Sequence, residues 1–337
     1  MTSSGPIEIV ATRGGAVESR HRVHAVVAGP DGDLVSVHGE AGLVAFPRSS
    51  LKAMQALSFV ETGAADRFEC SPVELALACA SHEGEDMHAD AVGAWLARMG
   101  LDPSALACGP QWPRREADMA RMIRDGGQPG RVHNNCSGKH AGMLATALHM
   151  GESLEGYADR AHPVQRRVFD TVSAMTGMDL SGAPVGIDGC SAPNPALPLG
   201  VMAVAAARFA EADPARLGDV RAAACRRLQA AMAAAPEMVG GTGRVDTDLI
   251  RAFAGRVFSK TGAEGVYFIY MPEKRLGAVL KAEDGAPRAS AAAIWNVLAE
   301  LGLLDGQAEA ALRRHCRPDI RNWDGLVTGR VAEASEV

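Results

Sequence analysis

The sequence predicts a mixed α/β fold of the α+β kind, with one antiparallel sheet built from both termini, packed with helices, and a helical region between. Three observations predict this class. Short β-rich runs lie near both ends, helical patterns fill the middle, and 47% of the 337 residues are hydrophobic. Strands at both ends of a chain are combined most simply in one sheet. We therefore expect a single domain over residues 1–337.

The N-terminal strands are expected at 7–12, 22–28 and 33–38. Gly14-Gly15 separates the first two runs, and Pro30-Asp31-Gly32-Asp33 is a hairpin signal between the second and the third. These three strands should form an antiparallel meander.

The central region is expected to be helical. Ser71-Pro72-Val73-Glu74 places Ser at an N-cap, Pro at the first helical position and Glu at the third, so a helix should run from there to about Ala80. Apolar residues at helical spacing predict a further helix over 49–62. The other helices are expected at 86–99, 114–125, 138–149, 160–175, 197–210, 215–234 and 246–254.

The C-terminal part returns to β structure. Strands are expected at 256–259, 265–270 and 276–281, and Pro272-Glu273-Lys274-Arg275 should turn the last pair. A helix at 287–302 follows, and no internal repeat or long linker interrupts the chain.

Composition excludes several classes of function. A net charge of −6 gives no basic surface for nucleic acid. The apolar runs are far shorter than the ~18 residues of a membrane span. Met1–Pro6 shows no basic segment followed by an apolar run, so we expect no signal peptide, no membrane partner and a cytoplasmic location. Seven cysteines, an odd number, favour free thiols over a disulfide framework.

The first chemical motif is Ser49-x-x-Lys52. Only five of the 34 basic residues are lysines, which draws attention to each. At the start of a helix, one turn places the Lys amine beside the Ser hydroxyl, and a neutral Lys can activate that hydroxyl as a nucleophile. The alternative is an N-cap Ser followed by a surface Lys.

Lys260-Thr261-Gly262, next to a predicted strand, strengthens the first motif. Ser-x-x-Lys, Ser-Asp-Asn and Lys-Thr-Gly together mark penicillin-recognising enzymes. The first and third occur here in the right order and context, whereas Ser-Asp-Asn is absent. Ser81 or Ser137 is its nearest substitute. The pair of motifs favours an active-site Ser/Lys system.

Two polar segments carry cysteines, Asn134–Gly142 and Asp188–Asn194. A cysteine in a polar loop is more often a thiolate than one in an apolar run. Cys136 and Cys190 with one further donor could bind Zn²⁺. His140 is the conventional third ligand and Lys139 an unusual one. A disulfide and plain polar-loop cysteines are the alternatives.

Two further features are weaker. Gly240-Gly241-Thr242-Gly243-Arg244 is either a flexible entry to a helix or an anion site in which Arg244 contacts a substrate carboxylate. His82, His88 and His133 have no metal-like spacing, so we interpret them as structural.

At these residues the sequence resembles the rhizobial-type L-asparaginases, also called the class 3 or asparaginase II family. The segments that carry the likeness are Phe46–Lys52, Ser81-His82, Asn135–His140, Asp188–Cys190 and Lys260–Gly265, and it extends over roughly residues 7–325. The resemblance implies a fold related to serine β-lactamases and serine glutaminases. It also implies two tandems, Ser49 with Lys52 and Ser81 with Lys260.

The same resemblance implies a zinc ion held by Cys136, Lys139 and Cys190, with Lys139 as a neutral amine. Arg48, His140 and Asp188 match the residues that line the family's substrate pocket.

We expect an L-asparaginase (EC 3.5.1.1) that hydrolyses L-asparagine through a Ser-Lys nucleophile and an acyl-enzyme. Ser49 is favoured as the nucleophile because it matches that of the β-lactamases. Zinc should orient the substrate and need not be essential for turnover. We also expect a homodimer with no nucleic-acid partner. The alternatives are a serine glutaminase of similar fold, a penicillin-binding or β-lactamase activity, and a non-catalytic zinc or thiol protein.

Overall fold

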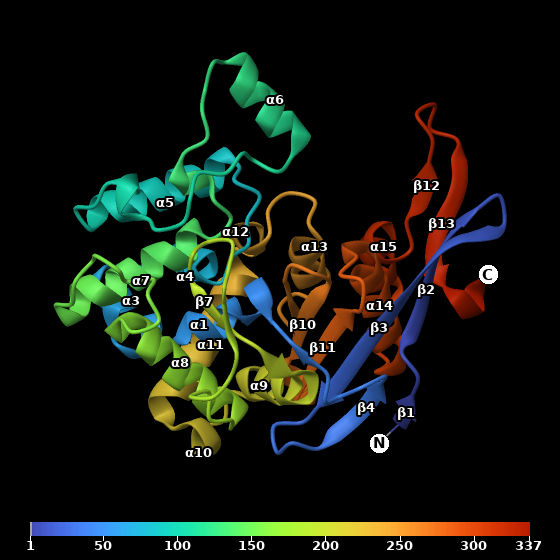
Figure 1. Ribbon diagram of the computed structural model, residues 1–337, viewed down its shortest axis with the longest axis horizontal. Coiled ribbons are helices and arrows are strands. Elements are labelled where there is room, and N and C mark those ends of the chain that lie inside the picture. The colour runs from blue at the N-terminus through green and yellow to red at the C-terminus, as the bar shows by residue number, and fades with distance from the viewer. Residues whose placement is uncertain (1) are drawn as a thin grey trace. The chain divides into compact units, whose positions relative to one another are not determined.

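The computed structural model describes residues 2–337 and confirms the mixed α/β class, with an antiparallel sheet that uses both ends of the chain (Figure 1). The chain divides into two compact units. The first comprises the described residues up to Ser50, with Ala196–Glu211 and Asp248–Val337. The second comprises Leu51–Pro195 and Ala212–Thr247. The single domain expected from the sequence stays a prediction.

The first unit is built on a sheet in which β12-β13-β2-β3-β11-β10-β9 are neighbours in this order, and β4 joins β3 to β1. The N-terminal strands, blue in Figure 1, lie beside the C-terminal strands in orange and red. Val26 of β3 faces Val279 of β11, and Ala11 of β2 faces Val331 of β13. The strands are β1 Thr2–Ser4, β2 Ile7–Arg13, β3 Ala16–Ala28, β4 Leu34–His38, β9 Phe258–Thr261, β10 Val266–Met271, β11 Leu276–Ala282, β12 Asp319–Arg321 and β13 Val327–Glu333.

Helices cover this sheet. α9 (Leu199–Glu211) and α14 (Pro287–Glu300) both contact β10 and β11, and every residue of β10 is buried. A Cβ at Gly277 of β11 would overlap the backbone of Ala207, so α9 lies directly on this strand. The unit also holds α15 (Gly306–Cys316) and a short pair of strands, β5 (Val44–Ala45) and β8 (Leu197–Pro198).

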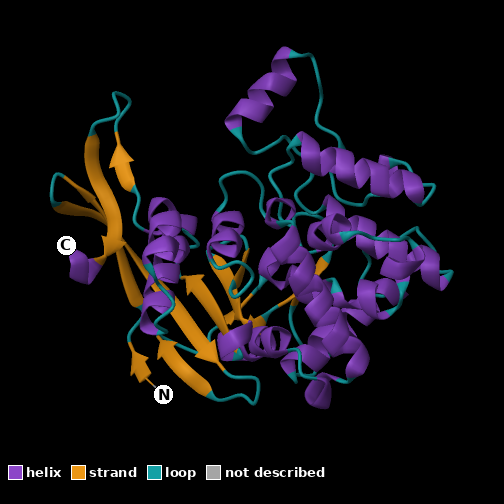
Figure 2. Cartoon of the chain, turned by 180° about the vertical axis from the view of Figure 1, so that it is seen from behind, coloured by secondary structure: helices purple, strands orange, loops and turns teal. Residues whose placement is uncertain are grey.

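The second unit is mainly helical, as the purple ribbons of Figure 2 show. It also contains a small antiparallel pair, β6 (Val185–Ile187) with β7 (Pro193–Pro195). α13 (Val245–Ala252) begins in this unit and ends in the first. The helices are α1 Lys52–Gln55, α2 Leu57–Glu61, α3 Ala64–Arg67, α4 Pro72–Ala78, α5 Asp86–Arg98, α6 Glu116–Arg124, α7 Ser137–Met150, α8 Pro163–Thr176, α10 Pro214–Leu217, α11 Asp219–Ala234 and α12 Pro236–Val239.

Two expected helices are broken. The segment 49–62 forms a 3-10 turn, Arg48–Leu51, followed by the short helices α1 and α2. The segment 215–234 is interrupted at Gly218, whose φ of 77° lies outside the helical range. Within residues 2–337, no helix is both long and apolar enough to cross a membrane.

Candidate active site

Ser49 lies in the 3-10 turn Arg48–Leu51 and is half-buried. Within the first unit, the chain that leaves β9 packs against the backbone of this turn. A Cβ at Gly262 would lie 2.8 Å from the Pro47 carbonyl oxygen and 3.3 Å from the Ser50 nitrogen. The Tyr270 hydroxyl donates a hydrogen bond to the Ser50 carbonyl at 3.1 Å. The Ser49 turn and the Lys-Thr-Gly segment are therefore neighbours, although they are far apart in sequence.

Three of the motifs contain a non-glycine residue in the left-handed region. The φ angles are 51° at Arg48, 72° at Ser191 and 57° at Glu264. Each costs on the order of 1 kcal/mol. Such positions persist where the surrounding structure holds them, and they gather at functional sites.

Both motif lysines are fully buried, Lys52 in the second unit and Lys260 in the first. Lys260 donates to the Thr261 carbonyl oxygen at 2.8 Å. Lys52 Nζ has three partners, the Ala80 carbonyl oxygen, Ser81 Oγ at 3.0 Å and the Asn135 carbonyl oxygen at 3.3 Å. The alternative of a surface lysine at position 52 is therefore wrong.

Helix α4 leads the chain to Ser81. The predicted capping box is present. The Ser71 side chain accepts a hydrogen bond from a backbone nitrogen of the first turn, and the Glu74 side chain accepts one from the Ser71 backbone nitrogen. Beyond the helix, the Ser81 nitrogen donates to the Val239 carbonyl oxygen at 3.0 Å. A Cβ at Gly138, in the first turn of α7, would overlap the Leu77 carbonyl of α4. Only glycine allows this approach, which places the start of α7 beside Ser81.

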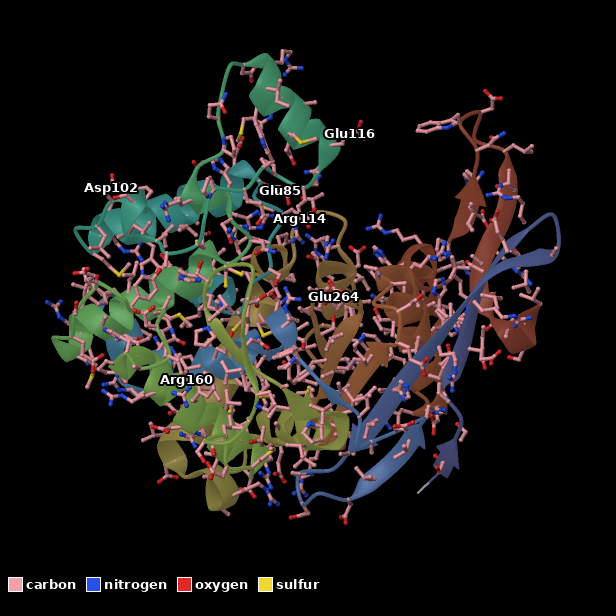
Figure 3. The ribbon with its side chains drawn as sticks, viewed as in Figure 1. Glu85, Asp102, Arg114, Glu116, Arg160 and Glu264 are labelled. Carbon is pink, nitrogen blue, oxygen red and sulfur yellow. The ribbon has the colours of Figure 1, made fainter. Side chains whose placement is uncertain are left out.

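The loop after Ser81 is held by ion pairs. Glu85 accepts hydrogen bonds from Arg115 at 2.6 Å and from the Thr242 backbone nitrogen at 2.8 Å. Arg244 lies 3.4 Å from the buried Glu83 carboxylate. Figure 3 shows Glu85 near Arg114, whose backbone nitrogen donates to the Glu83 carbonyl oxygen. The Gly-rich segment before α13 therefore anchors the Ser81 loop.

The histidines of this loop have structural contacts, as expected. His82 and His88 stack with ring centroids 4.6 Å apart. His82 accepts from the Gly84 nitrogen and contacts Ser137 Oγ, and His88 accepts from the Glu85 nitrogen and donates to the Glu237 carbonyl oxygen. Burial lowers the pKa of both, to about 4 for His88, so both rings are neutral near pH 7.

Cys136, Lys139 and Cys190 lie together in the second unit. Lys139 Nζ is 3.1 Å from Cys190 Sγ. A hydrogen bond from Cys136 lowers the pKa of Cys190 to about 4, with the charge of Lys139 acting in the same direction, whereas the pKa of Cys136 is raised to about 12. Burial acts to lower the pKa of Lys139, but the neighbouring thiols raise it overall. All seven cysteines have free thiols, so the disulfide alternative is wrong.

These three residues fit a borderline-soft cation. Two sulfur atoms and one nitrogen atom converge, and thiolate with a nitrogen donor is a ligand set that Zn²⁺ accepts. No cluster of three His, Cys, Asp or Glu residues suited to a metal occurs in the described part of the chain. The third donor would therefore be Lys139, whose ammonium group must release a proton when the metal binds. This is the set that the resemblance implied.

The other predicted site residues belong to both units. Arg48 lies in the first, next to Ser49. Asp188 opens a tight turn in the second, in which Ser191 donates to the Asp188 carbonyl oxygen and Cys190 is buried. His140 is fully buried, and its ring is within electrostatic reach of Lys139, Cys136, Lys52 and Asp188.

Sequence reasoning missed three residues that shape these groups. Gly138 and Gly262 allow the close approaches described above. Gly138 stands inside the Cys-Ser-Gly-Lys segment, and Gly262 inside Lys-Thr-Gly, so both were visible in the motifs but were not interpreted. Tyr157 contacts His140 at 2.7 Å from an irregular loop that carries no motif, and nothing local in the sequence marked it.

Comparisons with solved structures find crystal structures of Mglu in its native form, in its native form with 4.3 M NaCl, and in its tris and glutamate form. The sequence identities are 13%, 17% and 16%, and the TM-scores 0.46, 0.40 and 0.38. The matches cover 86%, 86% and 90% of this chain, which spans 66%, 63% and 64% of the length of those chains. No curated protein sequence matches the chain.

A model of the L-asparaginase II family matches residues 9–333, a span that includes every motif described above. Family membership rests on this match over nearly the whole length. The chain belongs to the L-asparaginase II family.

Proposed function

We propose that this chain is an amidohydrolase that converts L-asparagine to L-aspartate and ammonia. The family match over residues 9–333 supports amide hydrolysis as the reaction class. The observation that carries the mechanism is the buried Lys52, with Nζ 3.0 Å from Ser81 Oγ.

The partners of Lys52 define where its proton can go. The Ala80 and Asn135 carbonyl oxygens can only accept, so each takes one hydrogen from Nζ. The third position faces Ser81 Oγ. As an ammonium group Lys52 donates to this hydroxyl, and as a neutral amine it offers the hydroxyl its lone pair. Among these three partners, Ser81 is therefore the one with which Lys52 can exchange a proton.

The proposed reaction uses this exchange. Ser49 Oγ attacks the side-chain amide carbon of asparagine, and Lys52, its partner in the tandem that the family resemblance implies, takes the hydroxyl hydrogen. Ser81 gives its own hydrogen to the amide nitrogen and receives one from Lys52, so the C–N bond breaks and ammonia leaves. Water then attacks the acyl-enzyme, loses one hydrogen to Lys52, and releases L-aspartate as Ser49 regains its proton. Backbone N–H groups near Ser49 would stabilise the oxyanion.

The remaining residues would bind and orient substrate. Cys136, Lys139 and Cys190 would hold Zn²⁺, which supplies Lewis-acid attraction for a substrate carboxylate. Arg48, His140 and Asp188 would contact the amino-acid end. Lys260 would complete the second tandem with Ser81, as the family resemblance implies. The homodimer and the cytoplasmic location stay predictions.

The second candidate is a serine glutaminase. Glutamine is one methylene longer than asparagine, and a pocket discriminates one methylene by only about 1–3 kcal/mol. The same Ser-Lys chemistry would serve both amides, so substrate preference decides between them.

The test is ammonia release from L-asparagine, L-glutamine and, in parallel, the colour change of nitrocefin. We expect ammonia from asparagine with a kcat/KM at least about tenfold above that for glutamine. Higher activity on glutamine would favour the second candidate, and nitrocefin turnover would favour a β-lactamase. No activity in a folded, zinc-loaded preparation would favour the non-catalytic zinc or thiol protein.

A further inference from the structure

Tyr157 and His140 form a hydrogen-bonded chain inside the second unit. The Ala107 backbone nitrogen donates to the Tyr157 hydroxyl oxygen at 2.7 Å, and this oxygen lies 2.7 Å from His140 Nδ1. The two rings meet edge to face, with an interplanar angle of 75°. Tyr157 is 2% exposed and His140 is fully buried, so neither group exchanges these partners for bulk water.

Counting hydrogens along this chain fixes the direction of each bond. Tyr157 has one hydroxyl hydrogen, and Ala107 already donates to its oxygen. His140 Nδ1 is the only acceptor that contacts this hydroxyl within residues 2–337. A buried donor without an acceptor costs about 1–3 kcal/mol, so the hydroxyl donates to Nδ1. Nδ1 is then unprotonated, and the ring hydrogen lies on Nε2.

The other ring nitrogen of His140, Nε2, lies at the end of this hydrogen-bonded series. It is buried and has no hydrogen-bond partner among the described residues. The ring lies within electrostatic reach of Lys139, Cys136, Lys52 and Asp188, which are all predicted site residues. A buried N–H donor without a partner, among these groups, is suited to an acceptor that arrives with the substrate.

We propose that Tyr157 is a positioning residue, which holds His140 as the Nε2–H tautomer so that His140 donates a neutral N–H to a substrate oxygen. This role rests on the proposed function, and it specifies the chemistry at His140. The group bound there is an acceptor oxygen, such as a carboxylate or an amide carbonyl, and not an ammonium group. In the opposite tautomer Nε2 would be an acceptor or a metal ligand, and it would select a donor or a cation instead.

The tautomer can be measured without any substrate. We would label the histidines of the full-length, zinc-loaded protein with ¹⁵N, record the ring-nitrogen NMR spectrum, and assign His140 by its loss in His140→Gln. The proposal expects Nε2 to have the shift of a protonated nitrogen and Nδ1 that of an unprotonated one. A protonated Nδ1 with an unprotonated Nε2 overturns it. This result stands whether or not the chain hydrolyses asparagine.

Two substitutions at His140 test the donor itself. Gln places an amide N–H near the position of Nε2, whereas Asn reaches only the position of Nδ1 and leaves the site without a donor. We expect the affinity for L-aspartate, measured by calorimetry, to fall about fivefold to tenfold in His140→Asn and by less than about threefold in His140→Gln. Equal losses in both variants would contradict the donor role.

Tyr157→Phe tests the positioning role. We expect KM for L-asparagine to rise about fivefold to tenfold with a smaller change in kcat, and no further loss when Tyr157→Phe is added to His140→Asn. The matched control is Thr176→Val, which also removes a buried hydroxyl that accepts from a backbone nitrogen, here Met178 at 3.2 Å. The same KM change in the control, or full additivity with His140→Asn, would assign Tyr157 a purely structural role.

Discussion

Lys52 is the residue on which the proposed chemistry depends most. It is fully buried, and its three partners are two carbonyl oxygens and one hydroxyl. An arginine could keep the positive charge, but its guanidinium group stays protonated and cannot take a proton from a serine.

We therefore predict that Lys52→Arg lowers kcat for asparagine by about 10²–10⁴-fold, the usual contribution of general acid–base catalysis. Initial-rate ammonia assays measure this, with circular dichroism to confirm that the variant is folded. A folded variant that keeps more than about a tenth of the wild-type kcat would remove Lys52 from the role of base.

The proposed roles of Cys136 and Cys190 lead to a prediction about how much zinc the protein binds. Cys136→Ser and Cys190→Ser should each lower bound zinc, because each removes one of two sulfur donors from a three-residue set. Elemental analysis of protein purified without chelators gives the stoichiometry. Cys225→Ala, in the apolar part of α11, is the control and should leave zinc unchanged. Equal zinc in all variants would mean that Cys136 and Cys190 are buried cysteines that do not bind the metal.

The burial of His88 predicts how the stability of the fold depends on pH. Its folded-state pKa of about 4 lies below the ordinary 6.5, so the fold favours the neutral ring. The stabilisation is complete above pH 6.5 and is lost as the pH falls towards 4, because the unfolded chain then binds a proton that the folded chain excludes. The loss amounts to about 3 kcal/mol.

Urea unfolding at pH 7.5 and pH 4.5 measures this loss. The unfolding free energies at the two pH values should differ less in His88→Gln than in the wild type, by up to about 3 kcal/mol. The Gln amide can still donate to the Glu237 carbonyl oxygen. His149→Gln, at an exposed position, should keep the wild-type difference. An unchanged difference in His88→Gln would contradict a neutral, buried His88.

At the scale of elements, the close approach of α7 to α4 positions several of the predicted site residues of the second unit. Gly138 lies between Cys136 and Lys139 and faces the Leu77 carbonyl of α4. Gly142, one turn further along α7, has only ordinary contacts, 3.5 Å to Phe59 and 3.7 Å to Ala78. The two glycines form a matched pair in one helix.

We predict that Gly138→Ala destabilises the fold by about 1–3 kcal/mol, because the new methyl group forces the two helices apart. Gly142→Ala should be neutral or stabilising by up to about 1 kcal/mol, because alanine favours the helix. Urea denaturation compares the two variants, and ammonia assays show whether the displaced α7 also lowers activity. Equal stability of both would mean that the contact at Gly138 is not tight.

Most elements could be predicted because their signals are local. The capping box at Ser71 and the hairpin at Pro30–Asp33 are correct, and so is the run of strands from β9 to β11. The break between α1 and α2 could not be predicted from periodicity, since apolar spacing continues across it. β12 and β13 were missed because their residues are largely exposed or half-buried, and β13 is fixed by pairing with β2 at the other end of the chain.

At the scale of the whole molecule, the motifs come from distant parts of the chain. The first unit holds Arg48, Ser49 and Lys260, and the second holds Lys52, Ser81, Cys136, Lys139, His140, Asp188 and Cys190. The motifs contain these residues, but no pattern in the sequence pairs Lys52 with Ser81. That contact joins the first residue of α1 to a residue just beyond α4, and no local pattern encodes it.

In the proposed reaction, one serine forms an acyl-enzyme while the other moves protons. Intact-mass spectrometry after incubation with a slowly hydrolysed β-amide analogue of asparagine tests it most directly. We predict that the wild type and Ser81→Ala each gain the mass of one acyl group, and that Ser49→Ala gains none, because it lacks the attacking oxygen. An adduct on Ser49→Ala that is absent from Ser81→Ala would contradict the account and make Ser81 the nucleophile.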